Sequence, residues 1–125
     1  MQISTSTSLI SLTSEGLLEV KFLDNDLKID FEEAKAQSEA ANKLTGGKNM
    51  LVLVDARDSM HELTKEAKEF IAKVSGKKAE AIVVKELHQR IIATFYLKVT
   101  AKFFVHPVKV FSDRDLAVKW LLSMK

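Results

Sequence analysis

A short polar loop carries the densest set of reactive side chains in this chain of 125 residues. The loop begins at Asp55, the last residue of the mostly apolar run 50–55, and also contains Arg57, Asp58, Ser59 and His61. Aspartate, serine and histidine are the components of a nucleophilic triad, in which histidine takes the serine proton and aspartate orients the histidine. Such a triad depends on geometry, and no Gly-x-Ser-x-Gly elbow is present to expose the serine.

Ser59 also has a local structural explanation. Ser59-Met60-His61-Glu62 matches the capping box, in which a serine accepts a hydrogen bond at the start of a helix. We predict that Ser59 caps a helix that runs from about Glu62 to Val74 and stops at Gly76. No complete set of nucleophile, base and oxyanion donors is visible, so we expect no catalytic residue and no enzyme. The five polar side chains are interpreted instead as a candidate interaction loop for a protein partner.

Residue spacing gives no support to a metal or phosphate site. His61, His88 and His106 lie far apart without a His-x-x-x-His pattern, and the chain has no cysteine. We expect His106, which precedes a proline, at the surface or in a loop. Gly46-Gly47-Lys48 invites comparison with a phosphate-binding loop, but it precedes a strand pattern instead of opening a helix. We therefore expect no metal and no cofactor.

Aromatic side chains gather in the carboxyl-terminal half. The members of a candidate apolar pocket are Phe95, Tyr96, Phe103, Phe104 and Trp120. Aromatic residues at helical spacing belong to the core in most proteins, and that is the first interpretation. The alternative is a cavity beneath the third expected helix that binds a small apolar molecule or a lipid.

Composition and charge place the chain among globular single domains. Hydrophobic residues make up 46% and charged residues 29%, and 125 residues commonly form one core. The net charge of +2 divides into −5 for residues 1–62 and +7 for residues 63–125. The first interpretation of the basic half is that its lysines solvate helix exteriors, and the alternative is a basic face that attracts an acidic partner or an anionic membrane. No aromatic-rich basic stripe indicates nucleic-acid binding. We find neither a signal peptide nor an apolar run near the roughly 20 residues that span a bilayer, and we expect a cytoplasmic protein.

Strand and helix patterns alternate after a first hairpin. The expected strands cover residues 9–12, 17–23, 50–55, 81–84 and 108–111. Helices are expected after the capping box at residues 30–33, from about residue 62, from residue 87 and after the cap at residues 112–115. Residues 1–7 are expected to be flexible. The order ββαβαβαβα predicts a single α/β domain over residues 1–125, with a mixed, mostly parallel sheet. The strand at 50–55 has no polar residue before Asp55, which indicates burial on both faces.

Two helices carry readable local patterns. Asp30-Phe31-Glu32-Glu33 forms a capping box, in which Asp30 accepts from a backbone N–H near Glu33 and the Glu33 side chain reaches back. Gly46-Gly47 ends that helix. The third helix has an apolar face whose residues recur every four positions and are widened by two others: Leu87, Ile91, Phe95, Val99, Ile92 and Tyr96.

These elements together resemble a known family. The Val-Asp end of the 50–55 strand, the run at residues 106–113 (His-Pro-Val-Lys-Val-Phe-Ser-Asp), Ala117 and Trp120-Leu121 are similar to the STAS-like, SpoIIAA-like domains of bacteria. The resemblance covers about residues 8–123 and is greatest to an uncharacterised STAS/SEC14-like branch. It implies a sheet with strands in roughly sequential order, covered by helices.

The resemblance also implies a function. Members that antagonise anti-sigma factors are non-enzymatic switches, controlled by phosphorylation of a serine or threonine that begins the second helix. A phosphate there meets the positive end of a helix dipole and adds about two negative charges. The candidate phosphoswitch positions are Thr64 and Ser59. We therefore expect a non-catalytic module that works by protein contact, with the ligand-binding domain as the alternative.

Self-association is expected as well. A parallel strand needs cover on both faces, and helices placed mostly on one face leave the other for the amino-terminal hairpin or for a second subunit. We predict a homodimer.

Overall fold

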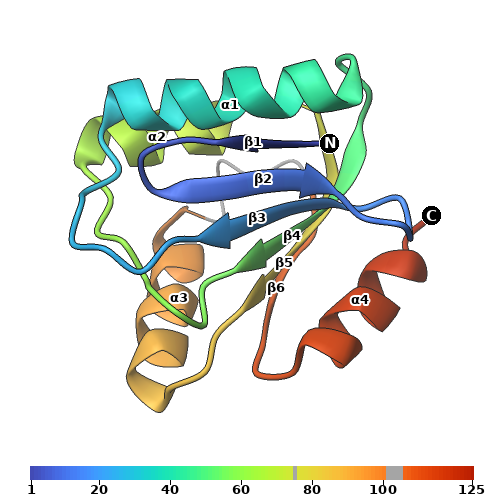
Figure 1. The fold of residues 1–125 in the computed structure, drawn as a ribbon. Coiled ribbons are helices and arrows are strands. Elements are labelled where there is room, and N and C mark those ends of the chain that lie inside the picture. The colour runs from blue at the N-terminus through green and yellow to red at the C-terminus, as the bar shows by residue number, and fades with distance from the viewer. Residues whose placement is uncertain (75, 101–105) are drawn as a thin grey trace.

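A single six-stranded sheet forms the centre of the molecule (Figure 1). The computed structural model describes residues 1–74, 76–100 and 106–125, without the side chains of residues 96, 99 and 100. The strands lie across the sheet in chain order and are β1 (Gln2–Ser4), β2 (Ser8–Leu12), β3 (Leu18–Phe22), β4 (Met50–Asp55), β5 (Lys77–Val83) and β6 (Val108–Phe111). β1 to β3 pair antiparallel, and β3 to β6 pair parallel. The expected mixed, mostly parallel sheet is confirmed.

Within the described residues, four helices cover the sheet: α1 (Phe31–Thr45), α2 (Lys65–Lys73), α3 (Leu87–Thr100) and α4 (Arg114–Leu122). α1, α2 and α3 each connect two adjacent parallel strands. Because such crossovers are right-handed and the strand order never reverses, all three helices lie on one face of the sheet. α4 follows the last strand and packs on the opposite face, as Figure 1 shows.

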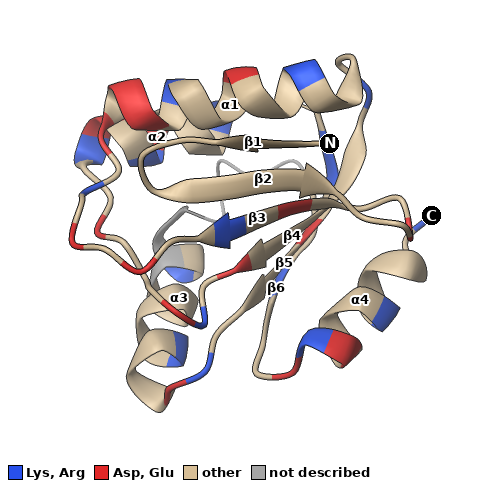
Figure 2. Ribbon diagram, viewed as in Figure 1, with Lys and Arg blue, Asp and Glu red and all other residues tan. Residues whose placement is uncertain are grey.

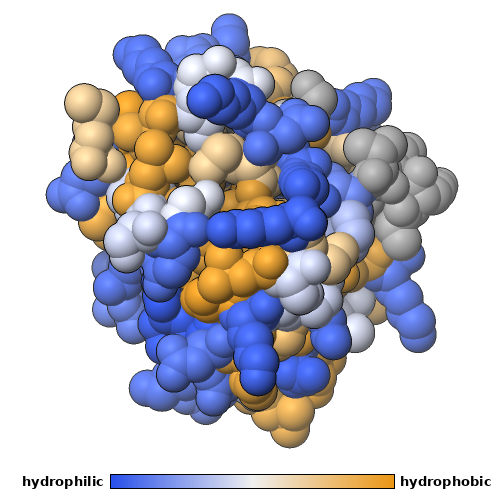
Figure 3. All heavy atoms as spheres, turned by 90° about the vertical axis from the view of Figure 1, so that its right-hand side faces the viewer, coloured by the Kyte–Doolittle hydropathy of each residue, from blue (hydrophilic) through white to orange (hydrophobic). Residues whose placement is uncertain are grey.

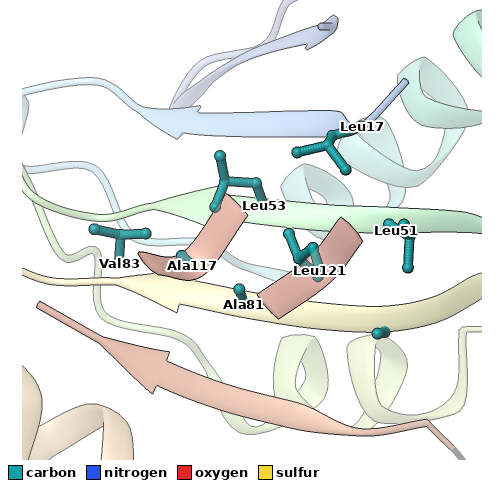
Figure 4. Packing of buried hydrophobic residues seen from close by; sticks show 8 residues of the cluster. Leu17, Leu51, Leu53, Ala81, Val83, Ala117 and Leu121 are labelled. Atoms are coloured by element: carbon teal, nitrogen blue, oxygen red, sulfur yellow. The ribbon is translucent and has the colours of Figure 1, made fainter. Parts of the chain in front are cut away.

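β4 is buried on both faces, as its unbroken apolar run predicted. Leu51 and Leu53 pack toward α4, in the cluster that Figure 4 shows with Leu121. Val52 and Val54 point the other way and contact the residues beneath α1 and α3. Because successive side chains of a strand point to opposite faces of the sheet, β4 contributes to the hydrophobic clusters on both faces.

The second face of the sheet is only partly covered by α4. An ion pair lies on the α4 side of β3, where Arg114 Nη2 is 2.8 Å from Glu19 Oε1. The amino-terminal hairpin does not fold over this face, because β1 and β2 extend the edge of the same sheet. The homodimer stays a prediction.

The amino terminus differs from expectation. We expected residues 1–7 to be flexible, but Gln2–Ser4 forms β1 and pairs antiparallel with β2, so the order is βββαβαβαβα. Glu33 of α1 explains the difference. Its carboxylate accepts hydrogen bonds from the Thr5 and Ser6 hydroxyls and from both the backbone N–H and the hydroxyl of Thr7. A polar segment without an apolar pattern is therefore ordered by one buried carboxylate.

The same contacts correct one half of the first capping box. The Asp30 carboxylate accepts from the Glu33 backbone N–H at 2.9 Å, and Gly46, at φ 65°, ends α1, as expected. The Glu33 side chain does not reach back to the cap, because its oxygens are occupied by the hydroxyls of the amino-terminal segment.

The expected cap of α2 is wrong. Thr64, not Ser59, begins the helix, and its hydroxyl oxygen accepts from the Ala67 backbone N–H at 3.2 Å. The residues before it are extended, since Leu63 forms a parallel bridge with Ile29. An extended segment cannot continue a helix from Ser59, so the cap moves five residues along the chain.

α3 turns its apolar face outward, against the interpretation of its aromatic residue as core. Phe95 is 67% exposed. The side of α3 that meets the sheet is formed instead by Gln89 and Ala93, which are buried, and by half-buried Leu97. The small side chain of Ala93 permits close packing of α3 against β6.

Gln89 fastens the start of α3. Its side-chain oxygen accepts from the backbone N–H groups of Lys85 and Glu86, at 2.8 and 2.9 Å. Its amide nitrogen donates to the carbonyl of Ala56 at 3.3 Å. A polar residue thus takes the buried position because it satisfies backbone groups at the helix start.

Candidate functional site

The carboxylate of Asp55 is occupied by its neighbour Arg57. Asp55 ends β4 and is only 3% exposed. Arg57 Nε and Nη2 donate to its two oxygens, each at 2.9 Å, and the Arg57 backbone N–H adds a bond of 3.1 Å. Burial raises the pKa of Asp55, but the hydrogen bonds and the charge of Arg57 outweigh it and hold the pKa below its usual value. Asp55 therefore shapes the loop as a paired anion and is not a free base.

Asp58 and Ser59 lie farther out on the candidate interaction loop. Asp58 is exposed, and its Oδ2 lies 3.6 Å from Lys21 Nζ of β3. The Ser59 hydroxyl is 3.5 Å from the carbonyl of Asn25, which is a weak contact. Of the five candidate residues only Asp58 is exposed, so its side chain is the one that a partner can reach most directly.

His61 is buried and holds the chain before α1. Its Nδ1 lies 2.7 Å from the carbonyl oxygen of Leu27, and its Nε2 lies 2.8 Å from that of Leu23. Carbonyl oxygens only accept, so a neutral imidazole, which has one N–H, donates a hydrogen bond to one of these two carbonyls. A protonated imidazole donates to both. Among the described residues no hydrogen bond joins His61 to Ser59. The loop does not assemble a triad.

A cavity of about 500 Å³ lies between the sheet and the layer of α1, α2 and α3. It extends along the parallel strands, from Met50 and Lys77 at their starts to Ala56 just beyond the end of β4. Its apolar walls include Val20, Phe22, Val52, Val54, Ile71 and Ile82. Figure 3 views the end of the molecule at the right of Figure 1 and shows hydrophobic side chains surrounded by hydrophilic ones.

The aromatic residues of the candidate pocket do not share one place. Phe95 lines the cavity, together with its neighbours Ile92 and Ala93. Trp120 lies on the other face of the sheet, where its ring centroid is 5.7 Å from that of Phe111. The proposed pocket set is therefore wrong at Trp120, because α4 packs opposite α3. The side chain of Tyr96, and Phe103 and Phe104, lie outside the described residues.

A charged cluster lines the cavity at Glu80. Glu80 is 8% exposed, and its Oε1 lies 3.0 Å from Lys77 Nζ and 3.3 Å from His106 Nε2. Burial raises the pKa of Glu80, but the Lys77 charge and the bonds from both partners lower it to about 2. His106 lies in the bend before β6, which confirms the loop placement, but its side chain is 6% exposed and so is not at the surface.

This cluster was missed in the sequence because the strand that corresponds to β5 was predicted to start at Ala81. The strand begins at Lys77, which places Glu80 on its cavity-facing side. The pattern that could have revealed it is Glu80, a charged residue between two small apolar residues, Ala79 and Ala81, which are both buried.

No group of three metal-ligating side chains occurs in the part of the chain that the structure describes. Within the same residues, no helix combines the length and the apolar character that crossing a membrane requires.

Comparison with known proteins places the fold and the family. No curated protein sequence matches the chain. An uncharacterized protein of the DUF3478 family from Shewanella loihica PV-4, described as having a SpoIIAA-like fold, superposes with a TM-score of 0.65 at 18% identity, covering 95% of this chain and 98% of its own. A protein of unknown function from Arthrobacter sp. FB24 gives a TM-score of 0.33 at 19% identity, over 90% and 97% of the two chains.

The first of these structures confirms the expected SpoIIAA-like fold. The sequential strand order of this chain agrees with the same expectation. Residues 10–125 match the family described as Domain of unknown function (DUF7793). The chain is thus a member of the DUF7793 family with a SpoIIAA-like fold.

Proposed function

We propose that this domain binds a small apolar or amphipathic molecule in the cavity beneath α1, α2 and α3, and that its role is binding and not catalysis. The observation that carries the proposal is the cavity of about 500 Å³ with mainly apolar walls. Ligand pockets commonly enclose roughly 300–1,000 Å³ and are lined by apolar side chains with a few polar groups.

Packing energetics support a bound molecule. The cavity is open to solvent over part of its surface, so water contacts its apolar walls when no molecule is bound. A bound apolar molecule removes that surface from water and gains van der Waals contacts with the walls. Because it binds the folded chain, it stabilises that state by mass action.

The charges around the cavity favour an amphipathic ligand with an anionic group. Lys48 and Lys68 line it, and neither has an ion-pair partner among the described residues. The two glutamates that also line it are already paired, Glu62 with Lys28 and Glu80 with Lys77. An apolar chain with a carboxylate would match both the walls and the unpaired lysines.

Fluorescence of N-phenyl-1-naphthylamine, a neutral apolar probe, tests the proposal. We expect the probe to bind, to be displaced by dodecanol and to be displaced at lower concentration by dodecanoate. Val54→Phe fills the cavity from the centre of the sheet, and Ala41→Leu fills it from α1. Each should weaken probe binding at least fivefold.

Val118→Phe is the matched control, because it adds the same ring on α4, on the other face of the sheet. We expect that variant to bind the probe within twofold of the wild type. Circular dichroism shows which variants fold. The proposal is wrong if the wild type does not bind the probe, or if folded Val54→Phe and Ala41→Leu bind as the wild type does.

A second candidate, the protein-contact module, is favoured by the position of Thr64. Its hydroxyl begins α2 and accepts from the Ala67 N–H, at the place where a phosphate would meet the positive end of the helix. Partner pull-down that is lost in Thr64→Glu or Asp58→Ala would support this function. Unchanged partner binding after Ser59→Ala and Thr64→Ala would contradict it.

A further inference from the structure

We propose that the exposed apolar face of α3 docks the domain on an anionic lipid bilayer. The proposal goes beyond ligand binding and depends on a different observation, the outward orientation of α3.

The first argument is apolar exposure. Four large apolar side chains within three turns of α3 face solvent, with exposed fractions of 74% at Leu87, 60% at Ile91, 54% at Ile92 and 67% at Phe95. Leu87, Ile91 and Phe95 are spaced by four and so form one stripe on the helix. A contiguous apolar surface of this kind indicates a binding face, whereas single exposed apolar residues do not.

The second argument is charge. α3 contains no aspartate or glutamate, and it carries Arg90 and Lys98, both exposed. Figure 2 shows blue bands along α3 and red only at the turn before it, where Glu86 lies beside Lys85. Helices that lie in a bilayer interface combine an apolar face with lysine and arginine, because anionic headgroups attract the basic side chains.

The same charge argues against a second copy of this chain as the occupant. In a two-fold dimer through α3, each helix would meet an identical helix. Arg90 and Lys98 of one copy would then approach the same cations of the other, with no acidic side chain on either helix to pair with them. An anionic bilayer supplies the missing charge.

The third argument is the position of α3 in the fold. Its inner side is held by Gln89 and Ala93, so the outer side is free without loss of the helix's attachment. Ile92 and Phe95 are exposed and also line the cavity. Docking through α3 would therefore place the wall of the cavity next to the acyl chains.

Co-sedimentation of the full chain with vesicles tests the proposal. We expect binding to phosphatidylglycerol vesicles that is at least fivefold stronger than to phosphatidylcholine vesicles, and that weakens in 0.5 M salt. The double variant Ile91→Ser/Phe95→Ser should reduce the bound fraction at least fivefold. Arg90→Gln/Lys98→Gln should reduce it on phosphatidylglycerol and abolish the preference.

Leu116→Ser is the matched control, since Leu116 is 57% exposed but lies on α4, on the other face of the sheet. It should bind vesicles within twofold of the wild type. No binding to phosphatidylglycerol, or an equal loss in Leu116→Ser, would overturn the proposal. So would a dimer, seen by native mass spectrometry, that Ile91→Ser/Phe95→Ser dissociates. Probe binding measured on the same samples separates failure of docking from failure of the ligand-binding proposal.

Discussion

At the scale of single residues, two buried carboxylates join distant segments of the chain by polar contacts, whereas apolar packing joins segments elsewhere. Glu33 accepts hydrogen bonds from three consecutive residues of the amino terminus and so attaches that segment to α1. Burial raises the pKa of Glu33, but these hydrogen bonds outweigh it and hold the pKa below its usual value. Glu80 plays a comparable role between β5 and His106.

Glu33→Ala should destabilise the chain by about 2–3 kcal/mol, because it leaves the buried Thr7 N–H and hydroxyl without their acceptor. Urea unfolding measures the change. Amide exchange should also increase in β1, which Glu33 helps to hold. The neighbouring Glu32→Ala removes an exposed carboxylate and serves as the control, with an expected change below about 0.5 kcal/mol. Equal effects of the two substitutions would contradict the assigned role.

Glu80 predicts acid sensitivity. Its folded-state pKa of about 2 lies below the unfolded value of 4.5, so its contribution to stability is present above pH 4.5 and is lost as the pH falls through about 2. Urea unfolding between pH 7 and pH 2 should show an acid loss in the wild type that is roughly 2–3 kcal/mol larger than in Glu80→Gln. Glu69→Gln, which changes an exposed carboxylate on α2, should follow the wild type. A parallel pH dependence of Glu80→Gln and wild type would refute the assignment.

At the scale of elements, helix starts follow from local sequence only where the preceding chain is free to turn. Asp30 caps α1 as its local pattern indicated, and α4 is capped within the predicted residues 112–115, by Asp113. Ser59 has an equally good pattern, but the chain after it is held by the Ile29–Leu63 bridge and by the bonds of His61. The helix therefore starts at the next suitable residue, Thr64.

Removing the hydroxyl of Thr64 or of Ser59 shows which of the two residues caps α2. Thr64→Ala should cost about 1 kcal/mol of stability, because the Ala67 N–H loses its acceptor. Ser59→Ala should cost less than about 0.5 kcal/mol, since its contact with Asn25 is long. Chemical unfolding followed by far-ultraviolet circular dichroism measures both. A larger effect at Ser59 than at Thr64 would show that the assigned cap is wrong.

α3 illustrates how a periodic pattern can be correct about the element and wrong about its orientation. Residues 87, 91 and 95 do lie on one face of a helix, as their spacing predicted. That face is exposed, and the sheet is met by Gln89 and Ala93 instead. Periodicity records that an apolar face exists, whereas the partner of that face is decided elsewhere in the chain or outside it.

At the scale of the whole molecule, sequential strand order places α1, α2 and α3 on one face of the sheet, and α4 is the helix that the described residues place on the other. The three-helix face holds the cavity, and α3 at its edge exposes apolar side chains that continue into the cavity wall. The two proposals therefore concern one face of the molecule. α4 and its cluster form a packed core without a cavity role.

The expected homodimer also belongs to this scale. Native mass spectrometry at micromolar concentration should give a mass near twice the 14.0 kDa of the chain. The same spectrum reports any molecule that remains bound in the cavity. A mass of 14.0 kDa would contradict the dimer and leave the ligand-binding proposal unaffected.

By itself the sequence determined the order of strands and helices after the first strand, the burial of β4 on both faces, the cap at Asp30 and the start of the last helix at residues 112–115. These features depend on residues within a few positions of one another. Only the tertiary structure decided where the Glu33 and Glu80 carboxylates bind. Each finds partners 26 residues away in the chain, at Thr7 and at His106. It likewise decided that Thr64 begins α2 and that α3 faces outward, because both depend on packing between segments that no local pattern connects.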